Sequence, residues 1–423
     1  MMSSDNSTEQ AQAMTGVPSH AFLVIPGGAV HPKTGGGQRS RVVFEAMRAI
    51  CPVTVVILGE HRETGAEVFF PGAAAVRGIV VRSFTDLGRG RIAKQLRIGK
   101  RLLRPRSDMA VEPALRDELR ALVRSEGKAV VVFRYFLTFA RSGIVDDPAG
   151  GVRVVVDVDD RDDRKMAVQL RSRLGARLGA LTARRLSPKV LDLVVARLRD
   201  AGLVWLAKEE DRFDGAAFAQ AIVPNVPFPL DRGDDVGPAA DGTSVLFVGS
   251  AGHMPNRQAV LWFLDRCWPV VRAACPAAEC RVVGFGDWSE VSARHGATAG
   301  VTIVGAVESV AGEYRGARLA VCPIREGAGS QIKVIEACAF GRPVVATTIA
   351  SRGFGPAIAE AIEKADDPGA FAAGCVRYLT DPDLATRTGR LLRDLQRRSY
   401  SREAASNQIA LGLTRLDVSS PPS

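Results

Sequence analysis

The stretch EGAGSQIKVIEACAFGRPVVAT, residues 326–347, joins a glycine-rich turn to a helical pattern and then to an apolar run. Lys333 and Glu336 are three residues apart and therefore share one face of the expected helix. The first turn of a helix has unpaired N–H groups and a partial positive charge, so a lysine is unfavourable there unless an anion lies beside it. Gly327 and Gly329 would let such a ligand approach the backbone. The stretch therefore predicts a diphosphate-binding helix start.

The alternative for this pair is an ordinary ion pair on an exposed helix face. Glutamate before lysine is the favoured order along a helix, whereas here the lysine comes first. The flanking Ile332 and Ile335 indicate that the helix packs against a sheet. We therefore favour the phosphate site, with Ser330 as the N-cap.

Short β-branched runs alternate with helical patterns on both sides of this stretch. Strands are expected at 20–25, 53–58, 78–82, 129–133, 153–158 and 202–206, and again at 244–248, 280–283, 301–304, 319–322 and 343–346. Apolar strands separated by helices indicate parallel sheets that are covered on both faces. The sequence predicts an α/β protein with two Rossmann-like, doubly wound parallel-sheet domains facing across a cleft, and the cleft is the expected binding site.

A segment rich in proline, glycine and aspartate separates the two series of strands. We expect a disordered tail at 1–19, an N-terminal Rossmann-like domain at 20–229, a linker at 230–243, a C-terminal Rossmann-like domain at 244–382, helices at 383–416 that pack back on the N-terminal domain, and a disordered tail at 417–423. A chain of 423 residues is too long for one ordinary core, which fits this division.

The composition is that of an ordinary globular protein, with 46% hydrophobic and 24% charged residues. No apolar run approaches the roughly 18 residues of a membrane span, and the first 19 residues lack the basic region of a signal peptide. We therefore expect a cytoplasmic protein, whose seven cysteines are buried free thiols and not zinc ligands or disulfides. The net charge of +10 indicates an anionic partner, which is a nucleic acid, an acidic lipid or a phosphorylated small molecule.

Four segments of the C-terminal half carry a resemblance to a known family. They are FVGSAGHMPNRQAVLWF (247–263), VVGFGDW (282–288), VTIVGAV (301–307) and REGAGSQIKVIEACAFGRPVVAT (325–347). Their order and spacing resemble family 4 glycosyltransferases, in particular a branch of bacterial surface-polysaccharide sugar transferases. The resemblance implies a retaining, metal-independent enzyme of the GT-B fold. Its co-substrate would be a UDP- or GDP-linked sugar, with no further cofactor, and its acceptor a glycan or a lipid-linked molecule.

The resemblance also assigns roles to single residues. As catalytic residues, Glu336 would accept hydrogen bonds from the donor's ribose hydroxyls, Lys333 would hold the diphosphate and Glu326 would contact the transferred sugar. The donor-binding residues would be Gly249, Asn256, Gly284, Gly286, Val304, Gly305, Val307, Gly327, Ala328, Gly329, Ser330, Gln331 and Ile332. Glu326 and Glu336 are ten residues apart, whereas in many members of the family the corresponding pair is eight residues apart.

The acceptor side is expected in the N-terminal half. The loop PGGAVHPKTGGGQRSR (26–41) joins a strand to a helix that is expected to start near Gln38. It resembles the glycine-rich loop that faces donor phosphates and acceptor in this fold, and a flexible surface loop is the alternative. Where many members have a histidine, this chain has an acidic cluster, DVDD at 157–160, which we interpret as a strand end or as helix caps and not as a metal site. The acceptor-side set is Gly35, Gly36, Gly37, Arg39, Asp159 and Asp160, and no metal ligand is predicted.

Two segments carry much of the positive charge. Residues 88–106 contain eight basic residues, and their apolar residues recur at helical spacing. The segment predicts either a helix that lies on anionic lipid at the inner face of the cytoplasmic membrane, or the solvated face of a core helix. Residues 161–199 contain eleven basic residues against three aspartates and add positive potential to the same half.

Two other classes of function are kept as alternatives. One is a sugar-nucleotide epimerase or a phosphorylase on the same fold. The other is a non-catalytic nucleic-acid-binding protein, which the net charge suggests. The chain has only four tyrosines and four tryptophans and lacks the aromatic-basic motif of a nucleic-acid module, so we expect no nucleic-acid partner.

Overall fold

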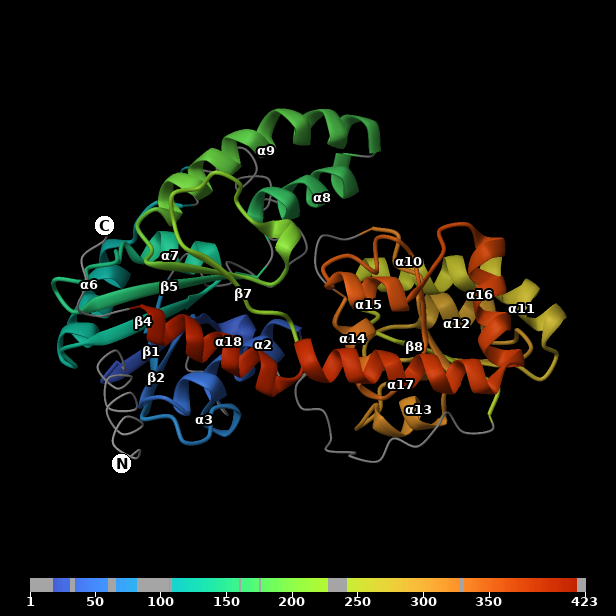
Figure 1. The fold of residues 1–423 in the computed structure, drawn as a ribbon. Helices are drawn as coiled ribbons and strands as arrows, with labels where there is room; N and C mark the ends of the chain where they lie inside the picture. Colours follow the sequence, from blue (N-terminus) through green and yellow to red (C-terminus); the bar gives the residue numbers. More distant parts are fainter. Residues whose placement is uncertain are drawn as a thin grey trace, which may run out of the picture. The chain divides into compact units, whose positions relative to one another are not determined.

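A computed structural model of the chain describes residues 18–30, 35–59, 66–81, 106, 109–159, 161–174, 176–226, 242–326 and 331–416. The chain forms two compact units, each built around its own parallel sheet (Figure 1). Unit 1 contains the residues up to Pro224 and those from Ala405 onward, and unit 2 contains Asn225–Ala404. The prediction of two parallel-sheet α/β domains is confirmed.

Unit 1 has a seven-stranded sheet in the order β3-β2-β1-β4-β5-β6-β7. Its strands are β1 (His20–Pro26), β2 (Val53–Gly59), β3 (Ala75–Val80), β4 (Ala129–Arg134), β5 (Val152–Asp159), β6 (Leu203–Leu206) and β7 (Gln220–Ile222). Its helices are α2 (Gly35–Arg48), α3 (Ala66–Phe69), α6 (Pro113–Arg124), α7 (Phe136–Ser142), α8 (Asp162–Leu174) and α9 (Ala176–Leu198), with short 3-10 turns at Gly27–Ala29 and Glu209–Asp211. The central strands are apolar along their whole length because helices cover both faces of the sheet.

Unit 2 has a six-stranded parallel sheet in the order β10-β9-β8-β11-β12-β13. Its strands are β8 (Ser244–Val248), β9 (Glu279–Val283), β10 (Val301–Gly305), β11 (Leu319–Cys322), β12 (Val344–Ala346) and β13 (Glu363–Lys364). Its helices are α10 (Met254–Trp262), which runs through a π-turn (Phe263–Cys267) into α11 (Trp268–Ala274), then α12 (Ser289–His295), α13 (Ala311–Gly316), α14 (Ile332–Ala339), α15 (Pro356–Ala361), α16 (Pro368–Thr380) and α17 (Pro382–Ser399).

The last helix, α18 (Arg402–Arg415), belongs to unit 1 from Ala405 onward, whereas α17 belongs to unit 2. Within unit 1, α18 packs against β6 through Gly412. A Cβ at Gly412 would lie 3.0 Å from Nε1 of Trp205, so the glycine permits the close approach.

The strand predictions agree with the structure to within three residues at each end. Two strands, β7 and β13, were not predicted. They are three and two residues long and only partly buried, so they lack the continuous apolar run that marked the others. The structure places the three glycines at 35–37 in the first turn of α2, which begins three residues before the predicted helix start at Gln38.

In both sheets the strand order reverses beside the first strand of the unit. The reversal lies between β1 and β4 in unit 1 and between β8 and β11 in unit 2. In open parallel sheets, ligands bind beyond the carboxyl ends of the strands at this point. The topology therefore predicts binding sites at the loops that follow β8 and β11 in unit 2 and at those that follow β1 and β4 in unit 1.

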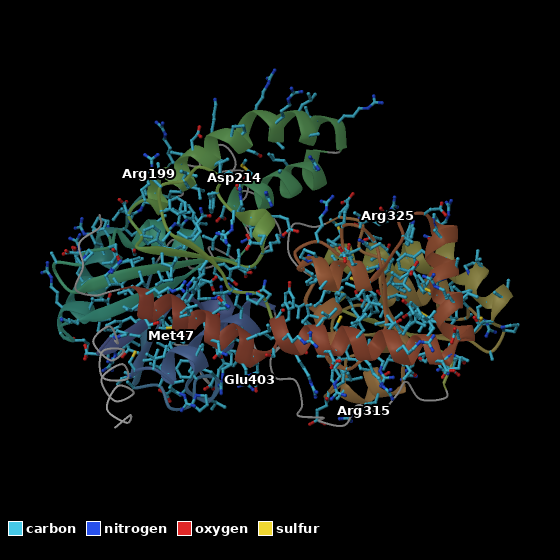
Figure 2. All side chains as sticks on the ribbon, in the orientation of Figure 1. Met47, Arg199, Asp214, Arg315, Arg325 and Glu403 are labelled. Atoms are coloured by element: carbon cyan, nitrogen blue, oxygen red, sulfur yellow. The ribbon has the colours of Figure 1, made fainter. Side chains whose placement is uncertain are left out.

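The basic segment at 161–199 forms α8 and α9, which pack against each other. Figure 2 shows long nitrogen-tipped side chains that project outward from α9. The other basic segment, 88–106, lies outside the described residues except for Arg106, as do the predicted linker up to residue 241 and both predicted tails except for Pro18 and Ser19.

The seven cysteines are all free, and six of them are buried. Burial raises the pKa of the thiols, to about 12 at Cys338, which keeps them protonated. The prediction of buried free thiols is confirmed, with Cys275 partly exposed. Among the described helices, none has both the length and the apolar character that crossing a membrane would take.

Candidate functional site

The loops that follow β8, β9 and β10 are joined by backbone hydrogen bonds. Gly249 N donates to Val283 O at 2.9 Å, and Gly284 N donates to Gly305 O at 2.7 Å. Two residues further along two of the loops, Ala251 N donates to Phe285 O at 2.8 Å. The carboxyl ends of three strands thus form one continuous edge in unit 2.

Two predicted donor-site glycines are required by the packing of this edge. Gly284 has φ of +145°, and a Cβ at this position would lie 1.9 Å from the carbonyl oxygen of Gly249. Gly286 has φ of +107°, and its Cβ would lie 3.0 Å from Gly252 N. Any side chain at either position would push the loops apart.

Lys333 lies in the first turn of α14, which begins at Ile332 with Gln331 as its N-cap. Its Nζ donates to Asn256 Oδ1 at 2.6 Å and lies 5.3 Å from the ring centroid of Phe247. Burial lowers the pKa of Lys333, and the neighbouring Cys322 and Glu336 oppose that shift. A partly buried cation is therefore held at the start of a helix, beside the point where the strand order reverses.

Glu336 lies one turn further along α14. Its Oε2 accepts a hydrogen bond of 3.0 Å from the hydroxyl of Tyr314, whose ring is stacked on Phe340 at 4.9 Å between centroids. Burial raises the pKa of Glu336 to about 7, although the bond from Tyr314 and the charge of Lys333 act in the opposite direction. The carboxyl group is thus fixed in position and titrates near neutral pH.

This raised pKa predicts a pH-dependent difference between the protein and the Glu336→Gln variant. Between the ordinary pKa of 4.5 and about 7, folded Glu336 keeps a proton that the unfolded chain has released. The contribution of this group to stability is therefore complete below pH 4.5 and is lost as the pH rises towards 7. Urea unfolding at pH 5 and pH 7.5 should show the wild type losing stability relative to Glu336→Gln. Parallel pH dependence in the two proteins would show that Glu336 has an ordinary pKa.

The other predicted residues of unit 2 lie along the same strand ends. Val304 and Gly305 close β10, and Val307 follows two residues later. Glu326 is exposed, four residues after β11, and among the described residues no hydrogen bond or ion pair joins it to Lys333 or Glu336. The predicted donor loop, Gly327, Ala328, Gly329 and Ser330, lies outside the described residues.

In unit 1 the strand ends hold a buried ion cluster. Asp157, at the carboxyl end of β5, accepts hydrogen bonds from Arg39 Nε at 2.9 Å and Nη2 at 2.7 Å, and it also pairs with Arg134. Arg39 Nη1 donates to Val223 O at 2.7 Å. All three charged side chains are at most 2% exposed. The anion that Arg39 meets in this structure is thus Asp157.

Two non-glycine residues with positive φ lie beside this cluster. They are Tyr135, immediately after β4, with φ of 70°, and Asp159, the last residue of β5, with φ of 60°. The Tyr135 ring lies 4.5 Å from the Arg134 guanidinium, and a Cβ at Gly36 would lie 2.2 Å from the Tyr135 hydroxyl. Such strained backbone gathers at functional sites. Sequence reasoning missed Tyr135, although its place directly after a central strand was a usable signal. Of the predicted acceptor-side residues, Asp160 lies outside the described residues.

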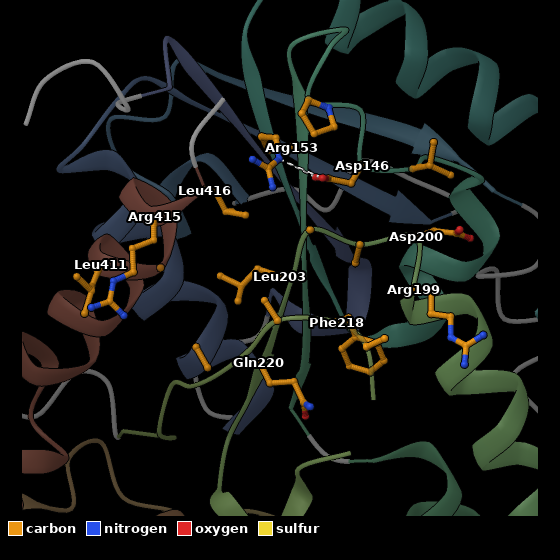
Figure 3. A pocket seen from close by; sticks show the side chains of 18 of the residues that line it. Asp146, Arg153, Arg199, Asp200, Leu203, Phe218, Gln220, Leu411, Arg415 and Leu416 are labelled. Atoms are coloured by element: carbon orange, nitrogen blue, oxygen red, sulfur yellow. Dashed lines mark hydrogen bonds and ion pairs between the residues drawn. The ribbon is translucent and has the colours of Figure 1, made fainter. Parts of the chain in front are cut away.

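A cavity of about 1020 Å³ in unit 1 lies at the other edge of the sheet, where β5, β6 and β7 begin (Figure 3). Leu203, Phe218 and Leu411 line it, together with Arg153, whose Nε donates to Asp146 Oδ1 at 3.0 Å. It is lined by the amino ends of the strands and by the last two turns of α18. It is therefore separate from the strand ends that carry Tyr135 and Asp159.

Comparison with known sequences identifies one region. Residues 242–381 match the family model described as Glycosyl transferases group 1. An uncharacterized 44.6 kDa protein in the cps region of Klebsiella pneumoniae is 25% identical over 185 residues, which are 42% of this chain and 46% of that protein. The chain thus matches just under half the length of this curated relative.

Solved structures share the fold over nearly the whole chain. Sucrose-phosphate synthase from Thermosynechococcus elongatus has 16% identity and a TM-score of 0.62, covering 95% of this chain and 100% of that one. Anabaena Alr3699/HepE in complex with UDP and glucose has 13% identity and a TM-score of 0.59, covering 94% and 100%. At such identities the likeness shows the fold alone, which is that of the two-domain GT-B proteins. The region 242–381, which matches the model of group 1 glycosyl transferases, lies within unit 2.

Proposed function

We propose that the protein is a retaining glycosyltransferase of family 4 that moves a hexose from a nucleoside-diphosphate sugar to a glycan or a lipid-linked acceptor in surface-polysaccharide synthesis. The observation that carries this proposal is Lys333, a partly buried cation at the start of α14 within the matched region 242–381. A diphosphate ligand would offset the unfavourable interaction between this cation and the positive end of the helix dipole.

The chemical reason is the charge that develops when a sugar–phosphate bond breaks. Positive charge grows on the anomeric carbon and negative charge on the departing diphosphate. Donors and cations fixed in advance around the leaving group lower the barrier most. Lys333 and the N–H groups at the start of α14 would supply that stabilisation, and no step of this account requires a metal.

The rest of the donor would lie along the edge formed by the loops after β8, β9 and β10. Glu336, held by Tyr314, would accept hydrogen bonds from the ribose hydroxyls, and Glu326 would contact the sugar. Phe285, between two glycines of positive φ, is 39% exposed and offers a ring on which the base can stack. The structures of Anabaena Alr3699/HepE with UDP and glucose and with UDP-glucose support a UDP-linked hexose as the first candidate, with GDP-linked sugars as the alternative.

The acceptor would be bound by unit 1, at the strand ends that carry Tyr135 and Asp159. The strained backbone at both residues supports this assignment. With retention, the acceptor hydroxyl would attack from the face that the nucleotide leaves, and a departing phosphate oxygen would take its proton. The buried cluster of Arg39, Arg134 and Asp157 would hold these strand ends in place and would not itself touch the acceptor.

A peripheral contact with anionic lipid at the cytoplasmic membrane is also part of the proposal. Besides residues 88–106, α9 exposes Leu178 by 57% and Leu181 by 62%, one turn apart. The exposed Arg177, Arg184 and Arg185 lie beside them on the same helix. Apolar side chains flanked by cations are typical of helices that lie on an anionic bilayer.

A screen of nucleotide sugars by thermal unfolding tests the donor class. A ligand at about 100 times its Kd stabilises the folded state by about 2.7 kcal/mol, which raises the Tm of a domain of this size by several degrees. We expect UDP- or GDP-linked sugars to raise the Tm of the protein, and duplex DNA to have no such effect. Stabilisation by DNA with no response to any nucleotide sugar would instead favour the nucleic-acid-binding alternative. Conversion of the donor to a new sugar nucleotide without an acceptor would favour an epimerase.

A further inference from the structure

Asn256 is a buried side chain whose two polar atoms are both used. It lies on α10, is 5% exposed, and its Nδ2 donates to Ser250 O at 2.9 Å. Its Oδ1 accepts the 2.6 Å hydrogen bond from Lys333 Nζ. A Cβ at Gly249 would lie 2.9 Å from Nδ2, so the missing side chain at Gly249 leaves the room that the amide occupies. The amide is therefore oriented: its nitrogen faces a carbonyl group and its oxygen faces the ammonium group.

Of the titratable groups that act on Lys333, only Glu336 becomes charged as the pH rises above about 7. Burial raises the pKa of the Cys322 thiol on β11, and burial together with Lys333 lowers the pKa of His253 at the start of α10, so both groups are neutral near pH 7. Glu336 on α14 is hydrogen-bonded to Tyr314, and its pKa is raised to about 7. Within the part of the chain that the structure describes, Lys333 forms no ion pair.

We propose that Asn256 is a positioning residue that fixes the ammonium of Lys333 with a neutral acceptor, so that the positive charge stays available for the donor's diphosphate. The inference rests on the proposed function and deepens it, because it names the residue that sets the charge of the phosphate site. In this role Asn256 contacts Lys333 and does not contact the donor.

The choice of asparagine over aspartate is the core of this inference. The two side chains have the same shape, but a carboxylate at 2.6 Å would form an ion pair with Lys333. The carboxylate would compete with the diphosphate for the same cation, and it would raise the pKa of the lysine because an adjacent negative charge favours the ammonium form. Asparagine orients the ammonium without either effect, and only its amide nitrogen can donate to Ser250 O.

The test compares Asn256→Asp with Gln258→Glu, which adds the same charge to an exposed position on the same helix. Binding of UDP and of GDP is measured by calorimetry from pH 7 to pH 10. In the wild type, affinity should fall at high pH as Lys333 loses its proton. In Asn256→Asp, affinity at pH 7.5 should be at least tenfold weaker, and the fall at high pH should move upward by about one unit, because the carboxylate stabilises the ammonium form. Gln258→Glu should match the wild type, and titration of the nucleotide itself is common to all three proteins.

A second variant covers the case in which Asn256→Asp does not fold. Asn256→Ala removes the acceptor without adding charge, so it should weaken UDP binding about tenfold and move the high-pH fall downward, since a hydrogen bond to the charged form is lost. Weaker binding in either folded variant with an unmoved pH profile would mean that Asn256 is only structural, and the inference would be wrong. Unchanged affinity would overturn it as well. A wild type that binds neither nucleotide would overturn the proposed function itself, which is a separate result.

Discussion

Replacing Lys333 by alanine is expected to lower the rate of sugar transfer by about 10²–10³-fold, the usual cost of losing one fixed donor to a developing negative charge. The ammonium of Lys333, in the first turn of α14, donates a hydrogen bond of 2.6 Å to Asn256 Oδ1. Its removal leaves the diphosphate with backbone N–H groups alone. The measurement is kcat/KM for transfer or donor hydrolysis, with circular dichroism and Tm to show that the variant is folded.

The matched control for this prediction is Lys364→Ala. Lys364 is an exposed lysine on β13 of the same unit, at the far edge of the sheet from β10. It should keep the activity of the wild type, since removal of a surface charge changes the protein's net charge but not the site. Equal activity in wild type, Lys333→Ala and Lys364→Ala would remove Lys333 from the catalytic account.

Replacing Asp157 by alanine should destabilise unit 1 by about 3–5 kcal/mol, because it leaves two buried guanidinium groups without their shared carboxylate. Arg39 and Arg134 are 2% and 0% exposed, so water cannot replace the lost partner. The cluster joins α2, β4 and β5, and its loss should loosen all three elements. Hydrogen exchange of peptides from 35–48 and 129–159 measures this locally, without requiring a single unfolding transition for the two units.

Asp192→Ala is the control for this second prediction. Asp192 is an exposed aspartate on α9, and its removal should change stability by less than about 0.5 kcal/mol. If hydrogen exchange in Asp157→Ala were no faster than in Asp192→Ala, the ion cluster would not hold the strand ends, and the support it gives to the acceptor region would disappear.

Much of the fold could be predicted because each central strand is a short apolar run between helical patterns. Runs such as those of β1 and β4 are buried on both faces, and that requirement is visible in the sequence itself. The edge strand β7 has no such requirement, since its residues are half-buried and it pairs with β6 alone. The start of α2 was placed too late because three consecutive glycines disfavour a helix, whereas the packing of Gly36 under Tyr135 allows one there.

The candidate site could be predicted only in part. Lys333 was predicted from its place at a helix start, which is a local property of the sequence, and Glu336 was assigned through the family resemblance. Their partners were not, because Asn256 and Tyr314 come from segments 77 and 22 residues away, and only the folded sheet brings them together. For the same reason the partner of Arg39 could not be foreseen, since Asp157 is 118 residues distant. The positive φ of Tyr135 leaves no trace in residue type, because tyrosine is not a residue that favours it.

The most direct measurement is a crystal structure of the protein with UDP, or with GDP where that nucleotide stabilises it more. The account predicts diphosphate oxygens within about 3 Å of Lys333 Nζ and of the first N–H groups of α14, with the ribose hydroxyls on Glu336. A nucleotide bound elsewhere, for example in the cavity of unit 1 lined by Arg153 and Phe218, with Lys333 in contact with Asn256 alone, would contradict it.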